Sequence, residues 1–174
     1  MRKELDEALC AKYPLIFSDR NKPMTETAMC WGFCCGDGWY NLIDTLCHLL
    51  YNDYSQAKDR YESIKDLAGQ PRWVGSDKIV TQEQIDEAKA KMEEEEKKVP
   101  VASQVKEKFG GLRFYVNGAT DKHWNYITFA ESMSYRICEE CGSPGKPYYD
   151  GWHRTLCDVH AEMENRKQQD KDEE

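Results

Sequence analysis

The feature that most constrains this chain is a group of four potential metal ligands near its C-terminus. Cys138, Cys141, Cys157 and His160 form a C-x2-C…C-x2-H pattern. Two cysteines separated by two residues can bind the same tetrahedral ion, and the second pair of ligands has the same spacing. Because protein side chains would fill all four coordination positions, we expect a closed, structural Zn²⁺ site rather than a catalytic one.

The residues around these ligands predict a small folding element of their own. Gly142 follows the first cysteine pair and tolerates a tight turn, while Asp150-Gly151 is a hairpin signal. A short helix is expected to begin near Asp158. The predicted order of knuckle, hairpin and helix over residues 138–164 resembles a treble-clef zinc finger. Such fingers occur in binding proteins and in enzymes, so the finger alone does not indicate a function.

Composition argues against several classes of protein. The 174 residues carry a formal net charge of -8, which disfavours general binding to nucleic acids or membrane surfaces, since both require a cationic face. No stretch approaches the roughly 18–20 apolar residues of a membrane span. The N-terminal residues lack an apolar signal core, so we interpret the eight cysteines as reduced thiols and metal ligands in a soluble, cytosolic protein.

The rest of the chain predicts an α+β fold in which N-terminal helices pack with a small antiparallel β-hairpin. A first helix should end before Pro14. Further helices are expected from near Trp39 to Leu50, over 55–68, over 81–98 and from Thr120 or Asp121 towards Cys138. Strands at 105–109 and 112–116 flank Gly110-Gly111, which we expect to form a two-residue hairpin turn.

Changes in composition divide the sequence into five predicted segments. The helix after residue 80 carries many Glu–Lys pairs and few apolar residues, and the last residues lack apolar anchors. The segments are an N-terminal helical region (1–76), a charged helical insertion (77–99), a β-hairpin plus helix (100–137), the zinc finger (138–164) and a disordered tail (165–174).

Aromatic and charged side chains alternate in three places and suggest a ligand site. The candidate ligand-binding residues are Asp37, Trp39, Tyr40, Arg113, Tyr115, Arg136, Trp152 and Arg154. Aromatic faces combined with arginines suit a planar base that carries a phosphate. The alternative is that the tryptophans fill the core while the arginines lie on the surface or shield the metal.

A second group of cysteines is a further candidate metal site, and the sequence contains no recognised catalytic motif. The group consists of Cys30, Cys34, Cys35, Cys47 and His48. Its spacing is not a common ligand pattern, so either a second metal site or ordinary core packing could explain it. We find no activated nucleophile, phosphate loop or dinucleotide motif, and therefore expect no enzymatic activity.

Several short stretches together resemble a known family. They are YPLIF (13–17), CGDGW (35–39), KEKFGGLRFY (106–115), CEECG (138–142) and GWHRTLC (151–157). As a set they resemble a family of small, zinc-finger-containing proteins encoded by tailed bacteriophages and prophages. The resemblance covers most of the chain except 77–99, and it transfers no catalytic residue. It implies an accessory protein expressed in the bacterial cytoplasm during infection.

Three functions remain open in that setting. The first is a counter-defence protein that sequesters a nucleotide-derived host immune signal, which the arginine and aromatic groups favour. The second is a protein-binding inhibitor or adaptor of a host factor, favoured by the acidic charge and the projecting helix. The third is a zinc-dependent nucleic-acid-binding protein, which the pI of about 5.1 disfavours. We favour the small-molecule ligand. A homo-oligomer is conceivable, but no heptad pattern specifies one.

Overall fold

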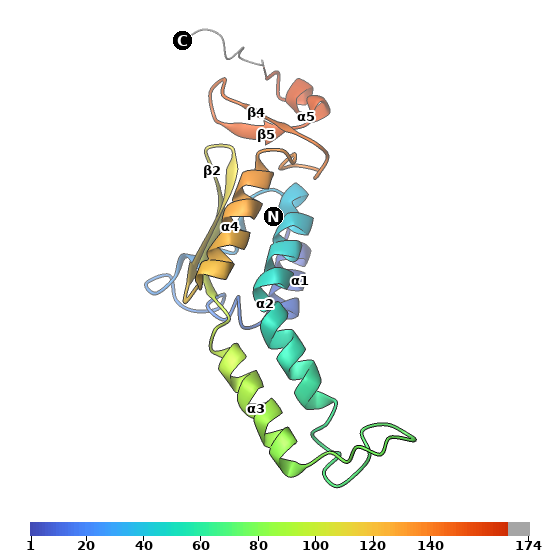
Figure 1. Cartoon of the computed structure of the whole chain (residues 1–174). Helices are drawn as coiled ribbons and strands as arrows, with labels where there is room; N and C mark the ends of the chain where they lie inside the picture. Colours follow the sequence, from blue (N-terminus) through green and yellow to red (C-terminus); the bar gives the residue numbers. More distant parts are fainter. Residues whose placement is uncertain (167–174) are drawn as a thin grey trace. The chain divides into compact units, whose positions relative to one another are not determined.

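Two compact units make up this α+β protein in the computed structural model, which describes residues 1–166 (Figure 1). The first unit combines Met1–Leu49 with the chain from Pro100 onward, and the second comprises Leu50–Val99. The second unit therefore begins at Leu50, well before the predicted insertion at 77–99. The predicted disordered tail at 165–174 falls, from residue 167 onward, outside the described residues.

The helices near the N-terminus follow the apolar pattern, with one difference. Helix α1 (Lys3–Lys12) ends just before Pro14, as expected. Two short 3₁₀ turns follow, η1 (Ala28–Trp31) and η2 (Asp37–Trp39). Helix α2 (Tyr40–Glu62) is continuous, whereas we expected two helices separated near residue 52. No glycine or proline lies in that stretch to interrupt the helix.

The first unit contains a three-stranded mixed sheet in the order β1-β2-β3. Its strands are β1 (Phe33–Cys34), β2 (Val101–Lys108) and β3 (Gly111–Asn117). Strand β1 is parallel to β2, and β3 is antiparallel to it. The predicted sheet was purely antiparallel, because the short strand β1 gave no recognisable alternation.

The hairpin turn lies one residue earlier than the sequence indicated. Lys108 pairs with Gly111, so the two-residue loop is Phe109-Gly110. Both loop residues have positive φ, 54° at Phe109 and 77° at Gly110, as a type I′ turn requires. A bulky aromatic residue rarely adopts this conformation, so the sequence pattern predicts the turn at the two glycines instead.

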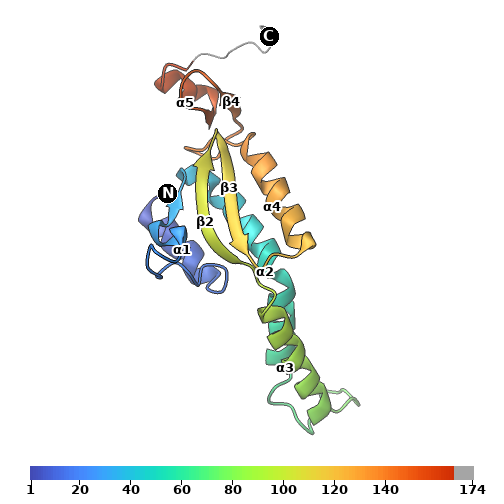
Figure 2. The same ribbon diagram turned by 90° about the vertical axis from the view of Figure 1, so that its left-hand side faces the viewer.

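The sheet packs on the first part of α2. Helix α4 (Asp121–Ser134) covers the edge of the sheet that strand β3 forms. Figure 2 shows α2 behind β2 and β3, with α4 alongside β3. The Ser134 hydroxyl oxygen accepts a hydrogen bond from Leu112 N (2.8 Å), and a Glu131 carboxylate oxygen accepts one from Phe114 N (2.9 Å). Helix α4 thus satisfies edge amides that would otherwise be unpaired.

The C-terminal element has the predicted order of knuckle, hairpin and helix. Strands β4 (Lys146–Tyr148) and β5 (Arg154–Leu156) form an antiparallel pair, and helix α5 (Asp158–Met163) follows. Cys138, Tyr148, Leu156 and Ala161 form a small buried cluster within the element. So small an apolar cluster contributes little on its own, which leaves the fold of the element dependent on additional contacts.

The second unit contains the end of α2 and helix α3 (Gln82–Glu96), joined by a long loop. The predicted capping box is present, because Thr81 and Gln84 exchange hydrogen bonds between side chain and backbone. Its buried cluster consists of Ile64, Val80, Ile85 and Ala88, with Tyr61 and Leu67 packed against it. No helix among residues 1–166 has the length and apolar character that a membrane span requires.

Candidate metal centre

The structure brings the four predicted ligands together. The ligand atoms of Cys138, Cys141, Cys157 and His160 all lie within 4.8 Å of one another. The Sγ–Sγ distance between Cys141 and Cys157 is 3.8 Å, and His160 Nδ1 lies 3.6 Å from Cys138 Sγ and 3.2 Å from Cys157 Sγ. This cluster could hold one metal ion, as predicted from the spacing.

Local backbone structure places each ligand pair. In the knuckle, Gly142 N donates a hydrogen bond to the Cys138 carbonyl (2.9 Å), and Gly142 has a φ of 78°. A glycine adopts this conformation without strain. Cys157 is the N-cap residue of α5, and His160 follows in the first turn of that helix. The same two-residue spacing therefore brings the ligands together in two ways. A turn positions Cys138 and Cys141, and the start of helix α5 positions Cys157 and His160.

The thiols of the cluster differ in how readily they ionise. Hydrogen bonds from Ser143 lower the pKa of Cys141 to about 6, and hydrogen bonds from His160 lower the pKa of Cys157. Burial instead raises the pKa of Cys138 to about 11. Metals bind the thiolate form. Two ligands are thus favoured as thiolates by their surroundings, while the buried one needs a cation beside it.

The knuckle rests directly on the backbone of residues 36–38, which we call the glycine segment. Gly38 N donates to the Glu139 carbonyl (2.7 Å), and Gly36 N donates to a Glu139 carboxylate oxygen (2.9 Å). A Cβ atom on Gly38 would lie 2.2 Å from the Cys138 carbonyl oxygen, and one on Gly36 would lie 2.3 Å from that of Glu139. Only glycine permits this approach.

Two predicted ligand-binding residues at the glycine segment, Asp37 and Trp39, have structural roles instead, which corrects this part of the predicted ligand set. Trp39 is fully buried (0% exposed), and its indole Nε1 donates to the Ile137 carbonyl (2.9 Å). A ligand cannot stack on it. Asp37 accepts a hydrogen bond from Arg2 N (2.7 Å) and pairs with the Arg2 guanidinium. Tyr40 is half-buried at the start of α2.

The tip of the β2–β3 hairpin forms a second contact with the C-terminal element. The buried hydroxyl of Thr155 donates to the Gly110 carbonyl (2.6 Å). A Cβ atom on Gly111 would lie 2.3 Å from the Tyr135 ring. Gly111 therefore allows close packing against Tyr135 at the end of α4. Gly110 instead supplies the positive φ of the turn, and a Cβ there would lie no closer than 3.4 Å to Arg154. Sequence spacing alone suggested a turn and gave no sign of this contact.

The predicted arginines are occupied by other groups. Arg154 forms ion pairs with Glu139 (3.3 Å), Glu164 (2.8 Å) and Glu140. Arg113 donates to the Leu112 carbonyl (2.7 Å) and the Tyr135 hydroxyl (3.0 Å).

The other predicted ligand residues are spread over the surface. Arg136 is exposed beyond the end of α4, and Tyr115 is exposed on β3, where the Lys106 ammonium lies over its ring. The structure does not bring the eight predicted ligand residues into one site.

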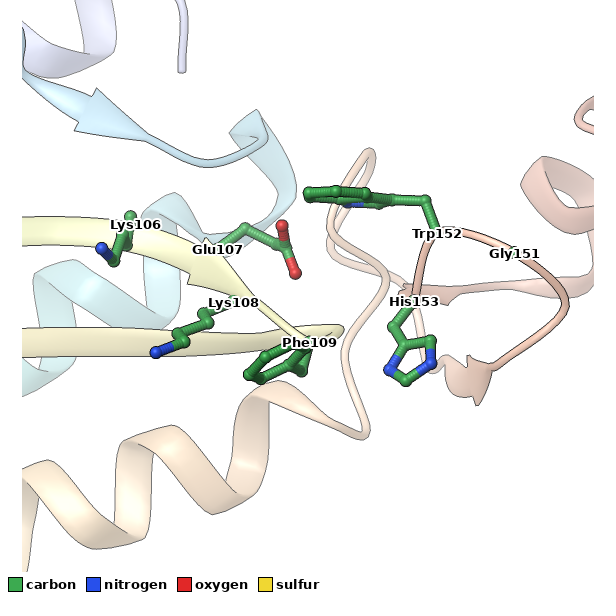
Figure 3. A pocket seen from close by; sticks show the side chains of 7 residues that line it. All are labelled: Lys106, Glu107, Lys108, Phe109, Gly151, Trp152 and His153. Atoms are coloured by element: carbon green, nitrogen blue, oxygen red, sulfur yellow. The ribbon is translucent and has the colours of Figure 1, made fainter.

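A hollow of about 410 Å³ lies between the hairpin tip and the β4–β5 loop (Figure 3). It is lined by Lys106, Glu107, Lys108, Phe109, Gly151, Trp152 and His153. The rings of Trp152 and Phe109 are 73% and 63% exposed. In Figure 3, Trp152 lies on one side, Phe109 and His153 lie on the other, and the Glu107 carboxylate points between them.

Only Trp152 of the predicted ligand residues lines this hollow. Lys106 and Lys108 were missed, although the alternation in the KEKF stretch places both on one face of β2. Neither has a carboxylate within ion-pair distance among residues 1–166; their ammonium groups instead lie over the rings of Tyr115 and Phe109.

The second cysteine group does not assemble. Within the described part of the chain, the C-terminal ligands are the one cluster of three or more potential metal-binding groups. Cys35 and Cys47 are buried, Cys34 and His48 are exposed, and Cys30 is half-buried. Burial raises the pKa of Cys47 well above its usual value, which suits an inert core thiol.

Comparison with known proteins adds no relative. No family model, no curated protein and no solved structure matches this chain. The resemblance to a bacteriophage family therefore stays a prediction from the sequence, and the function has to be argued from the site itself.

Proposed function

We propose that this protein is a non-enzymatic binding protein in which a structural Zn²⁺ ion fixes the β4–β5 loop, and the hollow beside that loop captures a nucleotide-like small molecule. The support comes from the donor set of the metal cluster and from the unusual lining of the hollow.

Zinc suits both the donors and their spacing. A tetrahedral ion with Zn–S near 2.3 Å and Zn–N near 2.0–2.1 Å separates two sulfurs by about 3.8 Å, and a sulfur from a nitrogen by about 3.6 Å. The Cys141–Cys157 and Cys138–His160 distances are 3.8 and 3.6 Å. The Cys157–His160 distance is 3.2 Å and the ligand atoms lie up to 4.8 Å apart, so small shifts would complete a tetrahedral site. Three thiols and an imidazole are soft and borderline donors, which disfavour Mg²⁺ and Ca²⁺.

The observation that carries the binding proposal is the placement of exposed Trp152 on one side of the hollow, opposite the rings of Phe109 and His153. The Glu107 carboxylate points between these rings, so a planar base that enters the hollow can stack on an exposed ring face and meet this carboxylate at its edge. The hollow's volume of about 410 Å³ falls within the usual range of small-molecule sites, roughly 300–1,000 Å³. Stacking on an aromatic side chain contributes about 1–3 kcal/mol per base.

The polar lining complements a base and a phosphate. Glu107 is held in place because one carboxylate oxygen accepts a hydrogen bond from Gly110 N (2.7 Å). The remaining acceptor capacity of this carboxylate suits an exocyclic amino group of a base. The ammonium groups of Lys106 and Lys108 point away from Trp152 in Figure 3 and have no carboxylate partners in the described region. They therefore supply positive charge at the rim of the hollow, where it suits a phosphate that extends from the base.

Capture without turnover is consistent with the biological setting that the sequence suggests. An accessory protein of a bacteriophage can counter host defence by lowering the free concentration of a nucleotide-derived signal. Such a protein needs affinity and abundance, and no catalytic group. We therefore propose sequestration of such a signal in the bacterial cytoplasm.

The test is binding of nucleotides to the zinc-loaded protein by calorimetry, with linear and cyclic mono- and dinucleotides as probes. Trp152→Ala should weaken binding by about 5- to 150-fold, since it removes one stacking surface. Trp124→Ala, which removes an exposed indole of α4 outside the hollow, is the matched control and should bind normally. Absence of binding at millimolar nucleotide, or equal weakening in both variants, would refute the proposal.

A further inference from the structure

The second unit contains a small hollow with a strongly positive lining. Its volume is about 90 Å³, and it is lined by Arg60, Ile64, Arg72, Lys78, Ile79, Val80 and Gln84. Three of these seven residues are cations and none is acidic. All seven belong to the second unit, so the hollow is independent of the metal centre and of the function proposed above.

Within the described residues, the three cations have no carboxylate partners, in contrast to four of the other arginines. Within residues 1–166, no ion pair involves Arg60, Arg72 or Lys78, whereas Arg2, Arg20, Arg154 and Arg166 all pair with carboxylates. In a chain with a net charge of -8, three unpaired cations around one hollow are unexpected. Their mutual repulsion would be relieved by a bound anion.

Backbone hydrogen bonds fix the positions of two of these cations. Arg72 N donates to the Lys78 carbonyl (3.2 Å), and Val80 N donates to the Gln70 carbonyl (2.9 Å). Pro71 and Ile79 form an isolated antiparallel bridge between the same two stretches. Arg72 and Lys78 therefore face each other across a narrow paired segment, and their proximity does not depend on a chance meeting of long side chains.

The size of the hollow selects the ligand. A volume of about 90 Å³ is too small for a nucleotide, because ligand sites for such molecules begin at roughly 300 Å³. It has room for a few water-sized groups, which is the scale of a single phosphate group. The forked guanidinium of arginine matches phosphate oxygens in pairs, and lysine adds a compact charge.

We propose that Arg60, Arg72 and Lys78 form an oxyanion site that binds one phosphate group carried by a phosphorylated peptide segment of a partner protein. The peptide is favoured over free phosphate because exposed apolar side chains adjoin the cations. Trp73 is 58% exposed, and Val74 and Ile79 are also exposed. A free anion makes no use of such a surface, whereas peptide side chains beside the phosphate can pack on it.

The test follows amide chemical shifts of the full-length, zinc-loaded protein by NMR. Inorganic phosphate should cause saturable shifts over residues 60–84 at millimolar concentration, and sodium chloride at equal ionic strength should not. The double variant Arg72→Gln/Lys78→Gln should weaken phosphate binding at least tenfold. Arg136→Gln, which neutralises an exposed arginine of the first unit, should leave it unchanged. Shifts that fail to saturate, or that persist in the double variant, would overturn the site.

A second arm separates the two sources of phosphate. A short synthetic peptide with phosphoserine flanked by leucines should bind at least tenfold more tightly than inorganic phosphate, and Trp73→Ala should remove that advantage. Equal affinity for the two probes would overturn the peptide as the ligand. The substituted residues are exposed, so an unchanged thermal midpoint is expected in every variant and confirms that folding is retained.

Discussion

Each of the two units of this chain is stabilised internally by a different kind of contact. In the first, the polar C-terminal element carries a Cys3His cluster that could hold a metal ion, and it makes close backbone contact with the glycine segment. In the second, helix α3 is attached by a small apolar cluster, and Lys–Glu pairs occupy much of its surface. Exposed ion pairs contribute about 0–1 kcal/mol each, whereas structural zinc contributes about 10–16 kcal/mol in finger peptides. We therefore expect the first unit to lose its folded structure abruptly when a ligand of the cluster is removed. The second unit should lose stability gradually as its ion pairs are removed.

Removal of one metal ligand is the strongest test of this difference. We expect Cys138→Ser to lose the metal and to unfold the C-terminal element. Even if only about 5 kcal/mol of stability is lost, the thermal midpoint should fall by about 10–20 °C. Cys34→Ser, at an exposed cysteine outside the cluster, is the control and should retain both metal and midpoint. Calorimetry would give the thermal midpoint and elemental analysis the bound metal. Equal midpoints and equal metal content in the two variants would contradict a stabilising role for the metal.

A methyl group on the glycine segment should have the next largest effect. In Gly38→Ala the added Cβ would meet the Cys138 carbonyl oxygen at 2.2 Å, and backbone atoms cannot move aside as a flexible side chain can. We expect a loss of about 3 kcal/mol in urea unfolding. Gly118→Ala places its Cβ in open space at a φ of 76°, so conformational strain of about 1–2 kcal/mol is expected. Equal losses would show that the knuckle does not depend on this contact.

Features encoded by local spacing could be predicted from the sequence. The four metal ligands lie in two short pairs, and the capping box of α3 spans Thr81 and Gln84. In both cases the residues that interact are close in the chain or share a distinctive chemistry. The α+β class and the end of α1 before Pro14 followed from patterns of the same kind.

Features that depend on distant partners could not be predicted in this way. From local sequence, the glycine segment is interpreted as a helix start beside a ligand site. Its actual partner, Glu139, lies about a hundred residues further along the chain and could not be inferred from local spacing. Arg154 looked available for phosphate, yet three carboxylates surround it in the folded protein. Sequence shows that an arginine is present, but only packing decides which anion it pairs with. The hollow beside Trp152 was missed for the same reason.

Acidification should produce the smallest effect and should act on the second unit through α3. The hydrogen bond from Lys98 lowers the pKa of Glu94, and the hydrogen bond from Lys91 lowers that of Glu95. A carboxylate with a lowered folded-state pKa stabilises the fold above its unfolded pKa, near 4.3, and this contribution disappears as the pH falls through the folded value.

We therefore expect the NMR signals of residues 82–96 to report partial loss of helix below about pH 4.3, with a smaller change in 1 M salt, which screens exposed pairs. In the double variant Glu94→Gln/Glu95→Gln, the helix should be slightly weaker at neutral pH and should lose most of this pH dependence. Because the change is followed within α3, it can be separated from acid release of the metal in the first unit. An unchanged pH profile in the double variant would show that these ion pairs do not stabilise the helix.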